Sequence, residues 1–294
     1  MSDAMKTEKM EELFETDLQP WMMLNLDGID VLVKEVKEVQ VEHMNLTTDA
    51  RIYYPEGDEP FPVMFYIHGG AFVGGFNGMD EPICRKMCCD GQCAVISPNY
   101  QLAPAHKFPA ALNELYDLLL YFKAHAAEYQ LDMNRLAIGG SSAGGNFAAA
   151  LCVKAYQTKE LKFKYQALLY PSIDLKSAWE TKVTPLTDTV AMEPKGIREM
   201  LEQYTAQGED LSNPLLSPFF GPAEAFPKTS IFNGNQCIFW KEDKEFADRL
   251  ASAGVEVLFK SYANVGHGFM ELKGHEEVSR DVKQIISNEI KRNL

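Results

Sequence analysis

The sequence is poor in cysteine and in basic residues, and it contains no long hydrophobic run. Six cysteines in 294 residues are too few for a disulfide-stabilised scaffold. Lysine and arginine number 28 against 42 acidic residues, and the net charge of −14 disfavours nucleic acid and anionic lipid as partners. No apolar run approaches the roughly 18 residues that span a bilayer, and residues 1–14 lack the basic and apolar regions of an export signal. We expect a cytoplasmic protein without a membrane span.

Four of the cysteines lie close together, at Cys84, Cys88, Cys89 and Cys93. Their spacing is not that of paired zinc ligands, and neither a second pair nor a nearby histidine completes a ligand set. A spacing of four residues places Cys84 and Cys88 on one face of a helix. We therefore expect buried thiols here and no metal.

Eight runs of β-forming residues alternate with helical patterns. The first two, at 33–44 and 50–54, predict an antiparallel pair. The later runs are apolar at nearly every position, which suits strands covered on both faces of a parallel sheet. They lie at 63–67, 94–97, 136–138, 165–170, 230–232 and 255–262, with helical patterns at 110–126, 146–156, 242–253 and 275–290. The alternation predicts an α/β fold with a mostly parallel eight-stranded sheet and helices on both faces.

Residues 176–217 interrupt this alternation, because they carry no strand pattern. A stretch of about 40 residues is too long for an ordinary loop. We expect residues 1–294 to form a single domain, with a helical cap built from about 1–30 and 176–217 over the open edge of the sheet.

The motif Gly140-Ser141-Ser142-Ala143-Gly144 directly follows the predicted strand 136–138 and opens the next helical pattern. Strand, sharp turn and helix are the context in which a G-x-S-x-G motif presents a nucleophilic serine. The glycines leave room for the tight turn, so that Ser142 projects above the sheet. A small-residue turn can carry the same letters by chance, but this context favours Ser142 as a nucleophile.

A second motif, His68-Gly69-Gly70-Ala71, follows the predicted strand 63–67. Attack on a carbonyl group creates an oxyanion, and glycine amides can approach it without interference from a side chain. We expect the amides of Gly69, Gly70 and Ala143 to form this oxyanion hole. His68 precedes the serine, unlike the base of a G-x-S-x-G hydrolase, so we interpret it as a residue that organises the loop.

A third motif, residues 264–269, follows the last predicted strand and contains His267 between two glycines. In a G-x-S-x-G hydrolase the serine comes first in the chain, the acid second and the histidine last. Apart from His68, the other four histidines lie in strand, loop or helix-end patterns that are typical of surface, capping and structural residues. His267 is therefore the candidate general base.

Together these motifs closely resemble the hormone-sensitive-lipase-like branch of the α/β-hydrolases. The resemblance extends from about Val63 to Phe269 and includes further motifs in the family's order, at 100–104, 108–111, 170–171 and 266–269. It implies an α/β-hydrolase fold and a carboxylic ester hydrolase with a two-part cap and no cofactor. It also implies that Ser142 is the nucleophile, His267 the base, and Gly69, Gly70 and Ala143 the oxyanion donors.

The chain departs from the family's pattern at the position of the triad acid. After the seventh strand the family has a glycine and then, about three residues on, an aspartate. This chain has Gly234 followed by Cys237, and the F-A-x-x-L pattern at 246–250 fixes the register. A neutral thiol, with a pKa of ~8.5, offers no charge to stabilise the imidazolium formed during attack. Smaller departures are Ser141, where the family has aspartate, and Ala71, where it has glycine.

The departure at Cys237 leaves three interpretations open. Asp174, beyond the sixth strand, could supply a relocated carboxylate, although capping of a loop or helix is the commoner role for such a residue. Glu242 and Asp243 are expected on a solvated helix face. Alternatively the enzyme is weak, or the fold binds a ligand without turning it over.

We therefore predict a serine hydrolase that cleaves small carboxylic esters through an acyl-enzyme. The alternative is a catalytically weak or inactive ligand-binding pseudo-hydrolase. A peptidase of the same fold is disfavoured, because no propeller-like domain precedes the sheet. The expected partner is a small-molecule ester, nucleic acid is not expected, and a homodimer is compatible with the sequence.

Overall fold

The computed structural model of the chain describes residues 24–44, 46–75, 78–187 and 194–294. Within these ranges one eight-stranded sheet has the strand order β1-β2-β4-β3-β5-β6-β7-β8. Strand β2 is antiparallel to both of its neighbours, and all the other pairs are parallel. The strands are β1 Glu35–His43, β2 Leu46–Tyr54, β3 Phe61–Ile67, β4 Ala94–Asn99, β5 Leu131–Ser141, β6 Tyr165–Leu169, β7 Lys228–Gly234 and β8 Val257–Tyr262.

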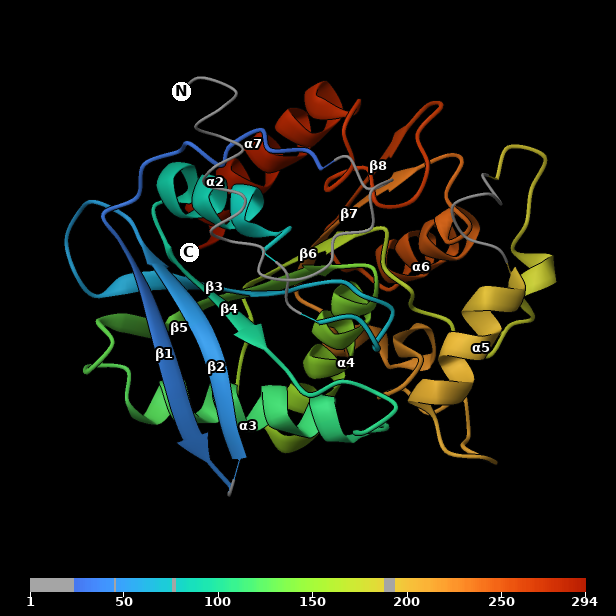
Figure 1. Cartoon of the computed structure of the whole chain (residues 1–294), viewed down its shortest axis with the longest axis horizontal. Coiled ribbons are helices and arrows are strands. Elements are labelled where there is room, and N and C mark those ends of the chain that lie inside the picture. The colour runs from blue at the N-terminus through green and yellow to red at the C-terminus, as the bar shows by residue number, and fades with distance from the viewer. Residues whose placement is uncertain (1–23, 45, 76–77, 188–193) are drawn as a thin grey trace.

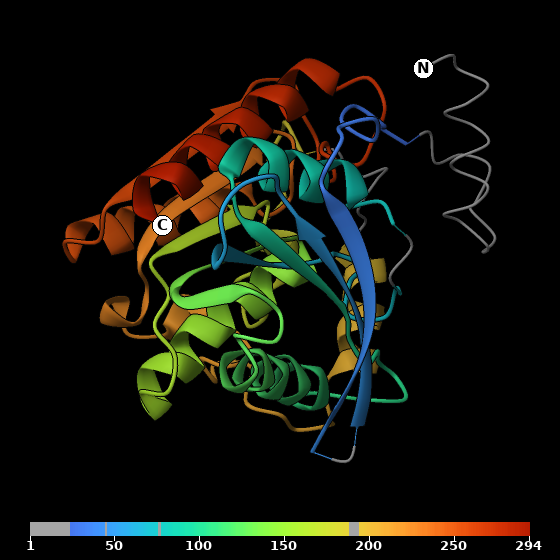
Figure 2. The same ribbon diagram turned by 90° about the vertical axis from the view of Figure 1, so that its left-hand side faces the viewer.

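Helices cover the sheet on both faces, as Figures 1 and 2 show. Helices α2 (Glu81–Gly91) and α7 (Glu276–Asn293) pack together on one face, and α3 (Ala110–Ala124), α4 (Ala143–Thr158) and α6 (Trp240–Ser252) lie on the other. This double cover explains why β3 is apolar throughout, since Val63 to Ile67 are all 0% exposed. Within the described ranges, no helix is long and apolar enough to cross a bilayer.

The predicted mostly parallel α/β sheet is confirmed, with the expected antiparallel pair at its beginning. Cys84 and Cys88 lie on α2 with buried side chains, and all six cysteines are free thiols. Of the predicted cap portion at residues 1–30, the structure describes only 24–30, which forms a β-bridge and a turn. Leu24 pairs there with Leu272, and the Asn25 amide donates to the carbonyl of Glu271 at 2.7 Å. Residues 1–23 lie outside the described ranges.

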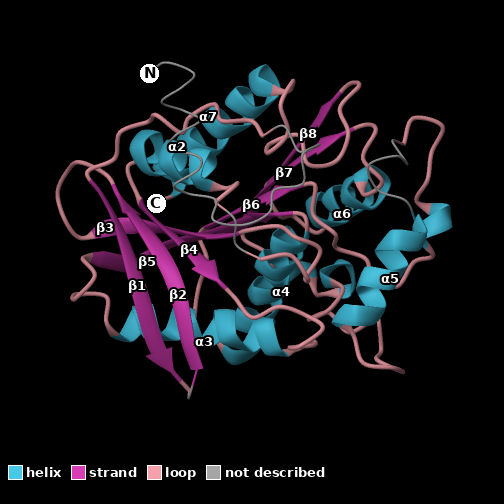
Figure 3. Cartoon of the chain, in the orientation of Figure 1, coloured by secondary structure: helices cyan, strands magenta, loops and turns pink. Residues whose placement is uncertain are grey.

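The segment that interrupts the sheet pattern contains a short helix, η1 (Trp179–Thr181), and helix α5 (Pro194–Tyr204). Figure 3 shows α5 beside the sheet, separate from the two helical layers. Its buried residues are Ile197, Leu201 and Tyr204. The Tyr204 ring stacks on Phe72 with a centroid distance of 4.0 Å, so α5 packs on the loop that follows β3.

Glu114 is a carboxylate on α3 that is only 1% exposed. Its Oε1 accepts a hydrogen bond from the Thr48 hydroxyl at 2.6 Å, and its Oε2 accepts one from the Gln101 amide at 2.7 Å. The neighbouring Tyr100 hydroxyl donates to the carbonyl of His68 at 3.0 Å. Glu114 therefore joins α3 to strand β2 and to the loop that supports His68.

Glu114→Ala should lower the free energy of unfolding by about 2–4 kcal/mol, because the buried Thr48 hydroxyl and the partly buried Gln101 amide would lose their acceptor. The control is Glu128→Ala at an exposed position beyond α3, which should change stability by less than about 0.5 kcal/mol. Urea denaturation of both variants measures the difference. Equal, small effects would contradict the anchoring role of Glu114.

Candidate functional site

Ser142 occupies the turn between β5, which ends at Ser141, and α4, which begins at Ala143. Its backbone has φ +53° and ψ −116°, a conformation that side chains rarely adopt. Three backbone hydrogen bonds hold the turn: the Ser142 amide donates to the Leu169 carbonyl at 2.9 Å, and the amides of Asn146 and Ser172 donate to the Ser142 carbonyl at 3.1 and 3.3 Å. The arrangement lifts the hydroxyl out of the sheet, as the motif predicts.

The turn also requires a very close approach of two backbone segments at Gly144. A Cβ atom there would lie 2.1 Å from the carbonyl oxygen of Ile67 and 2.4 Å from that of His68. Only glycine permits this contact. The nucleophile turn is thereby held directly against the end of β3, where the His68-Gly69-Gly70 loop begins.

His267 lies between the hydroxyl of Ser142 and the thiol of Cys237. Its Nε2 is 3.0 Å from Ser142 Oγ, and its Nδ1 is 3.2 Å from Cys237 Sγ. The Tyr170 and Phe239 rings each form a T-shaped contact with the imidazole, at centroid distances of 4.9 and 5.1 Å. The structure thus brings together three residues singled out in the sequence, in the order serine, histidine, cysteine.

The loops that carry Cys237 and His267 are bound to each other along their backbones. The amides of Asn235 and Gln236 donate to the carbonyls of Tyr262 and Val265, both at 2.9 Å. A Cβ atom on Gly234 would lie 2.1 Å from the Val265 carbonyl oxygen, so this glycine permits the close packing. These contacts fix the distance between the thiol and the imidazole.

The surroundings of Cys237 keep it protonated. The residue is 3% exposed, and burial raises the pKa of its thiol well above the ordinary value. The charges of Asp243 and Glu242 raise the pKa further, whereas the hydrogen bond from the Phe239 amide lowers it. The Phe239 amide is 3.4 Å from the sulfur.

The loop after β3 is organised by His68, as the sequence predicts. Its Nδ1 donates to the carbonyl of Gly69 at 2.6 Å, and its ring stacks on Tyr100 at 4.3 Å. A Cβ atom on Gly69 would lie 3.5 Å from the Cβ of Ser142, so the loop backbone lies directly beside the serine. Gly70 has φ +129°, which favours glycine. The Ala143 amide is the first of α4 and lacks an acceptor within the helix.

A narrow pocket of about 30 Å³ opens above Ser142. Its walls are mainly apolar and come from the loop after β3, the segment after β6 and the loop between β7 and α6: Phe72, Leu175, Trp179, Ile197, Leu201 and Phe239. In the described ranges, no group of three or more histidine, cysteine or acidic side chains is arranged to hold a metal ion.

Comparisons with known proteins agree with the assignment of this site to a hydrolase. A family model described as alpha/beta hydrolase fold matches residues 64–271. The chain belongs to the hormone-sensitive-lipase-like α/β-hydrolases. The alpha/beta hydrolase R526 of Acanthamoeba polyphaga mimivirus is 30% identical over 264 residues, which cover 88% of this chain and 75% of that protein. The arylesterase of Saccharolobus solfataricus is 28% identical over 260 residues, 86% of this chain and 82% of that protein.

A solved structure extends the likeness to three dimensions. The hyperthermophilic esterase from the archaeon Pyrobaculum calidifontis has a TM-score of 0.83 with this α/β-hydrolase at 26% identity, covering 99% of this chain and 94% of the other. Membership of this esterase family supports ester hydrolysis as the general reaction of the chain.

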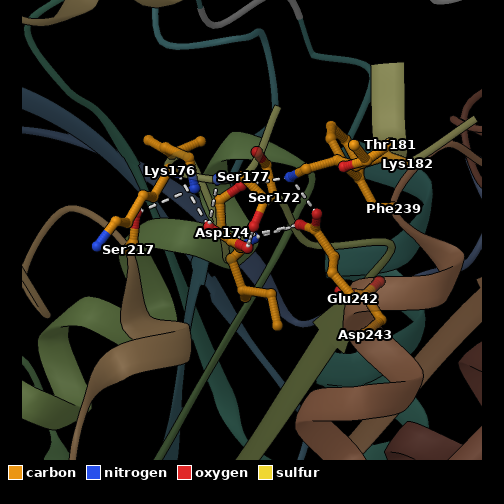
Figure 4. Close-up of polar contacts among 12 residues, drawn as sticks. Ser172, Asp174, Lys176, Ser177, Thr181, Lys182, Ser217, Phe239, Glu242 and Asp243 are labelled. Carbon is orange, nitrogen blue, oxygen red and sulfur yellow. Dashed lines mark hydrogen bonds and ion pairs between the residues drawn. The ribbon is translucent and has the colours of Figure 1, made fainter. Parts of the chain in front are cut away.

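Asp174 lies away from the imidazole in this α/β-hydrolase. Its carboxylate accepts hydrogen bonds from the amides of Lys176 and Ser177 at 2.9 and 3.1 Å and from the Ser177 hydroxyl at 2.5 Å. Figure 4 shows these contacts closing a turn around the carboxylate. Asp174 therefore caps a turn, while Nδ1 of His267 faces Cys237.

The prediction of a solvated face for Glu242 and Asp243 is wrong. Both are buried, at 5% and 0% exposure. Glu242 pairs with Lys182 of the interrupting segment and accepts the amides of Ile173 and Asp174 at 3.1 and 3.3 Å. A sequence signal was available, since positions 243, 246, 247 and 250 recur at helical spacing and share the buried face of α6.

Burial lowers the pKa of His267 to about 3. The ring should therefore stay neutral from about pH 5 to 8, in contrast to an exposed imidazole. Titration of protein labelled with ¹⁵N-histidine, with signals assigned by His267→Gln, should show no midpoint near 6.5 for this ring. Such a midpoint would contradict the environment described.

The same shift makes stability depend on pH. In the unfolded chain the imidazole of His267 is protonated below about pH 6.5, whereas in the folded protein it is protonated only below about pH 3. The contribution of His267 is therefore fully present above pH 6.5 and is lost as the pH falls from there toward 3.

Proposed function

We propose that the protein is a serine hydrolase that cleaves small carboxylic esters through an acyl-enzyme. The observation that carries the proposal is the 3.0 Å contact between Oγ of Ser142, on its strained turn, and Nε2 of His267. A hydroxyl at this distance from a neutral imidazole can pass its proton to the ring as it attacks a carbonyl carbon.

The reaction proceeds in two stages. Ser142 attacks the ester carbonyl, His267 takes the hydroxyl proton, and the amides of Gly69, Gly70 and Ala143 stabilise the oxyanion. His267 then protonates the departing alcohol, which leaves the acyl group on Ser142. Water activated by the same imidazole releases the acid and restores the serine.

The pocket favours a small, apolar acyl group. Its volume of about 30 Å³ leaves little space above Ser142, and the Trp179 and Phe239 rings, in contact with each other, form part of its wall. Since Trp179 and Ile197 belong to the interrupting segment, we assign residues 176–217 as a cap over the site. The second cap portion predicted at residues 1–30 remains a proposal that rests on the family resemblance.

The thiol of Cys237 decides how well His267 can act. To accept a proton at Nε2, the imidazole must carry its proton on Nδ1 and donate it to the sulfur. A protonated thiol can instead donate to Nδ1, which puts the ring proton on Nε2, facing the serine. Neither tautomer gains the negative charge that stabilises the imidazolium, and loss of that charge typically costs ~10⁴-fold in kcat. We expect slow turnover.

The second candidate function is ligand binding without turnover, and the buried, protonated Cys237 is the observation that favours it. In that case the pocket above Ser142 would hold a small apolar ligand. The two candidates differ in whether the serine reacts.

Ser142→Ala should abolish both labelling by a fluorophosphonate probe and hydrolysis of p-nitrophenyl acetate, because the hydroxyl beside Nε2 of His267 is removed. Wild-type protein should be labelled once, at Ser142, as mass spectrometry of the labelled peptide can establish. Ser177→Ala, at a capping position outside the pocket, is the control and should leave labelling unchanged. A wild-type rate equal to that of Ser142→Ala would establish the binding function instead.

Cys237→Asp should raise kcat, by up to ~10⁴-fold, because a carboxylate beside Nδ1 stabilises the imidazolium and fixes the productive tautomer. KM should change little, since this charge acts in the transition state. The same substitution should raise the pKa of His267, which can be followed by ¹⁵N titration. Cys237→Ser, which adds no charge, is the matched control, and an equal gain with serine would contradict the argument.

A further inference from the structure

A buried ammonium group contacts the aromatic wall of the pocket above Ser142. Lys182 directly follows the short helix η1 and is only 4% exposed, although an ammonium is costly to remove from water. Its Nζ lies 4.0 Å from the centre of the Trp179 ring and 5.9 Å from that of Phe239. Both rings line the pocket, whereas Lys182 itself does not.

The local backbone places the ammonium over the indole. The Lys182 amide donates to the carbonyl of Trp179 at 3.1 Å, which closes the single turn of η1. Residues three apart eclipse in a turn of this kind, so the two side chains lie on the same side. A cation over the face of an indole is attracted by the ring, and more strongly where water is excluded. The indole also contacts Phe239 at a centroid distance of 6.0 Å.

The position of the ammonium is set from outside the interrupting segment's own helix. Its Nζ donates to the backbone carbonyl of Asp174 and to the carboxylate of Glu242, as Figure 4 shows. Oε1 of the same carboxylate accepts the amides of Ile173 and Asp174 at 3.1 and 3.3 Å. Since Glu242 belongs to α6, which packs on β7 and β8, the pair connects the pocket wall to the sheet.

The carboxylate in this pair is ionised at mildly alkaline pH. Burial raises the pKa of Glu242 to about 7 and the charge of Asp174 acts in the same direction, whereas the charge and hydrogen bond of Lys182 lower it. Assays at pH 8 therefore keep Glu242 negatively charged. Removal of one partner from a buried ion pair leaves the other uncompensated, so a variant that removes both charges is also needed.

We propose that Lys182 determines which acyl groups the pocket accepts, because it holds the Trp179 ring in place as part of the wall. This inference rests on the proposed hydrolase function, and Lys182 is a positioning residue, since it acts through the ring. A pocket of about 30 Å³ suits a short acyl chain. A longer chain requires the indole to turn aside, away from an ammonium that stays bound to Glu242 and to the Asp174 carbonyl.

The test compares kcat/KM for p-nitrophenyl hexanoate with kcat/KM for p-nitrophenyl acetate at pH 8, in the wild type and in Lys182→Met. Methionine retains a long apolar side chain and removes the ammonium. The wild type should prefer the acetate. In Lys182→Met the ratio of hexanoate to acetate should rise by about tenfold or more, through a gain with the hexanoate, because the indole is free to move.

Trp179→Ala is the reference, because it removes the ring itself and should raise the same ratio. In the Trp179→Ala background, Lys182→Met should add less than about twofold, since Lys182 acts through the ring. Full and additive effects in both backgrounds would overturn the proposal. The matched control is Lys176→Met, at an exposed lysine of the same segment whose Nζ lies 5.4 Å from the centre of the Phe220 ring. It should leave the ratio unchanged.

If Lys182→Met does not fold because Glu242 has lost its partner, the double variant Lys182→Met with Glu242→Gln takes its place. It removes both charges and should raise the ratio to the same extent. A pair that merely stabilises the fold would lower the rates with both esters in equal proportion. An unchanged ratio in the folded double variant would therefore overturn the proposal.

A second readout does not depend on turnover. Acrylamide quenching of Trp179, measured as the difference between each protein and its Trp179→Phe counterpart, should be weak in the wild type, where the residue is 3% exposed. It should be about twofold stronger in Lys182→Met, because the ring opens to solvent more often. Equal quenching would overturn the proposal. Should wild-type turnover equal that of Ser142→Ala, the hydrolase function fails, and quenching still decides whether Lys182 holds the ring.

Discussion

The turn at Ser142 holds a strained backbone conformation at the carboxyl edge of the sheet, and its geometry depends on a contact that leaves no space for a side chain. At Gly144 the backbone lies against the carbonyls of Ile67 and His68. This one contact joins the nucleophile turn to the loop that follows β3. Since α4 begins in the same turn, the serine, the helix N-terminus and the glycine loop are placed relative to one another by the sheet itself.

The third position of the triad shows how a fold can keep a geometry while changing its chemistry. The thiol of Cys237 lies where a carboxylate would meet the imidazole, at hydrogen-bonding distance from Nδ1. Backbone hydrogen bonds between the two loops hold that distance, and none of them depends on the identity of residue 237. A carboxylate would bring a fixed charge and an unambiguous acceptor, whereas a thiol brings neither.

Much of the fold could be predicted from the sequence, because a strand that is covered on both faces of the sheet is apolar at every position, as residues 63–67 are. The serine turn, the glycine loop and His267 were also predictable, since each requires small residues at fixed positions beside a strand. The burial of Asp243 was not predicted, because acidic residues in a first helical turn usually face solvent, and only the spacing to Phe246 and Leu250 suggested otherwise. The hydrogen bond between Asn233 and Asp243 could not be predicted either, because it forms where β7 meets α6, and these elements are adjacent only in the folded chain.

The loop that carries His267 is attached to the rest of the molecule on both sides. Before the histidine it is bonded to the end of β7, and after it Leu272 and Glu271 pair with Leu24 and Asn25. Residues from opposite ends of the sequence thus form one hydrogen-bonded unit around the imidazole. Local opening of that unit would free Asn25 and Glu271 together, so their amides should exchange with solvent at a common rate. Detachment of the segment that contains Leu24 and Asn25 would then change the position of His267 before it disturbed the core strands.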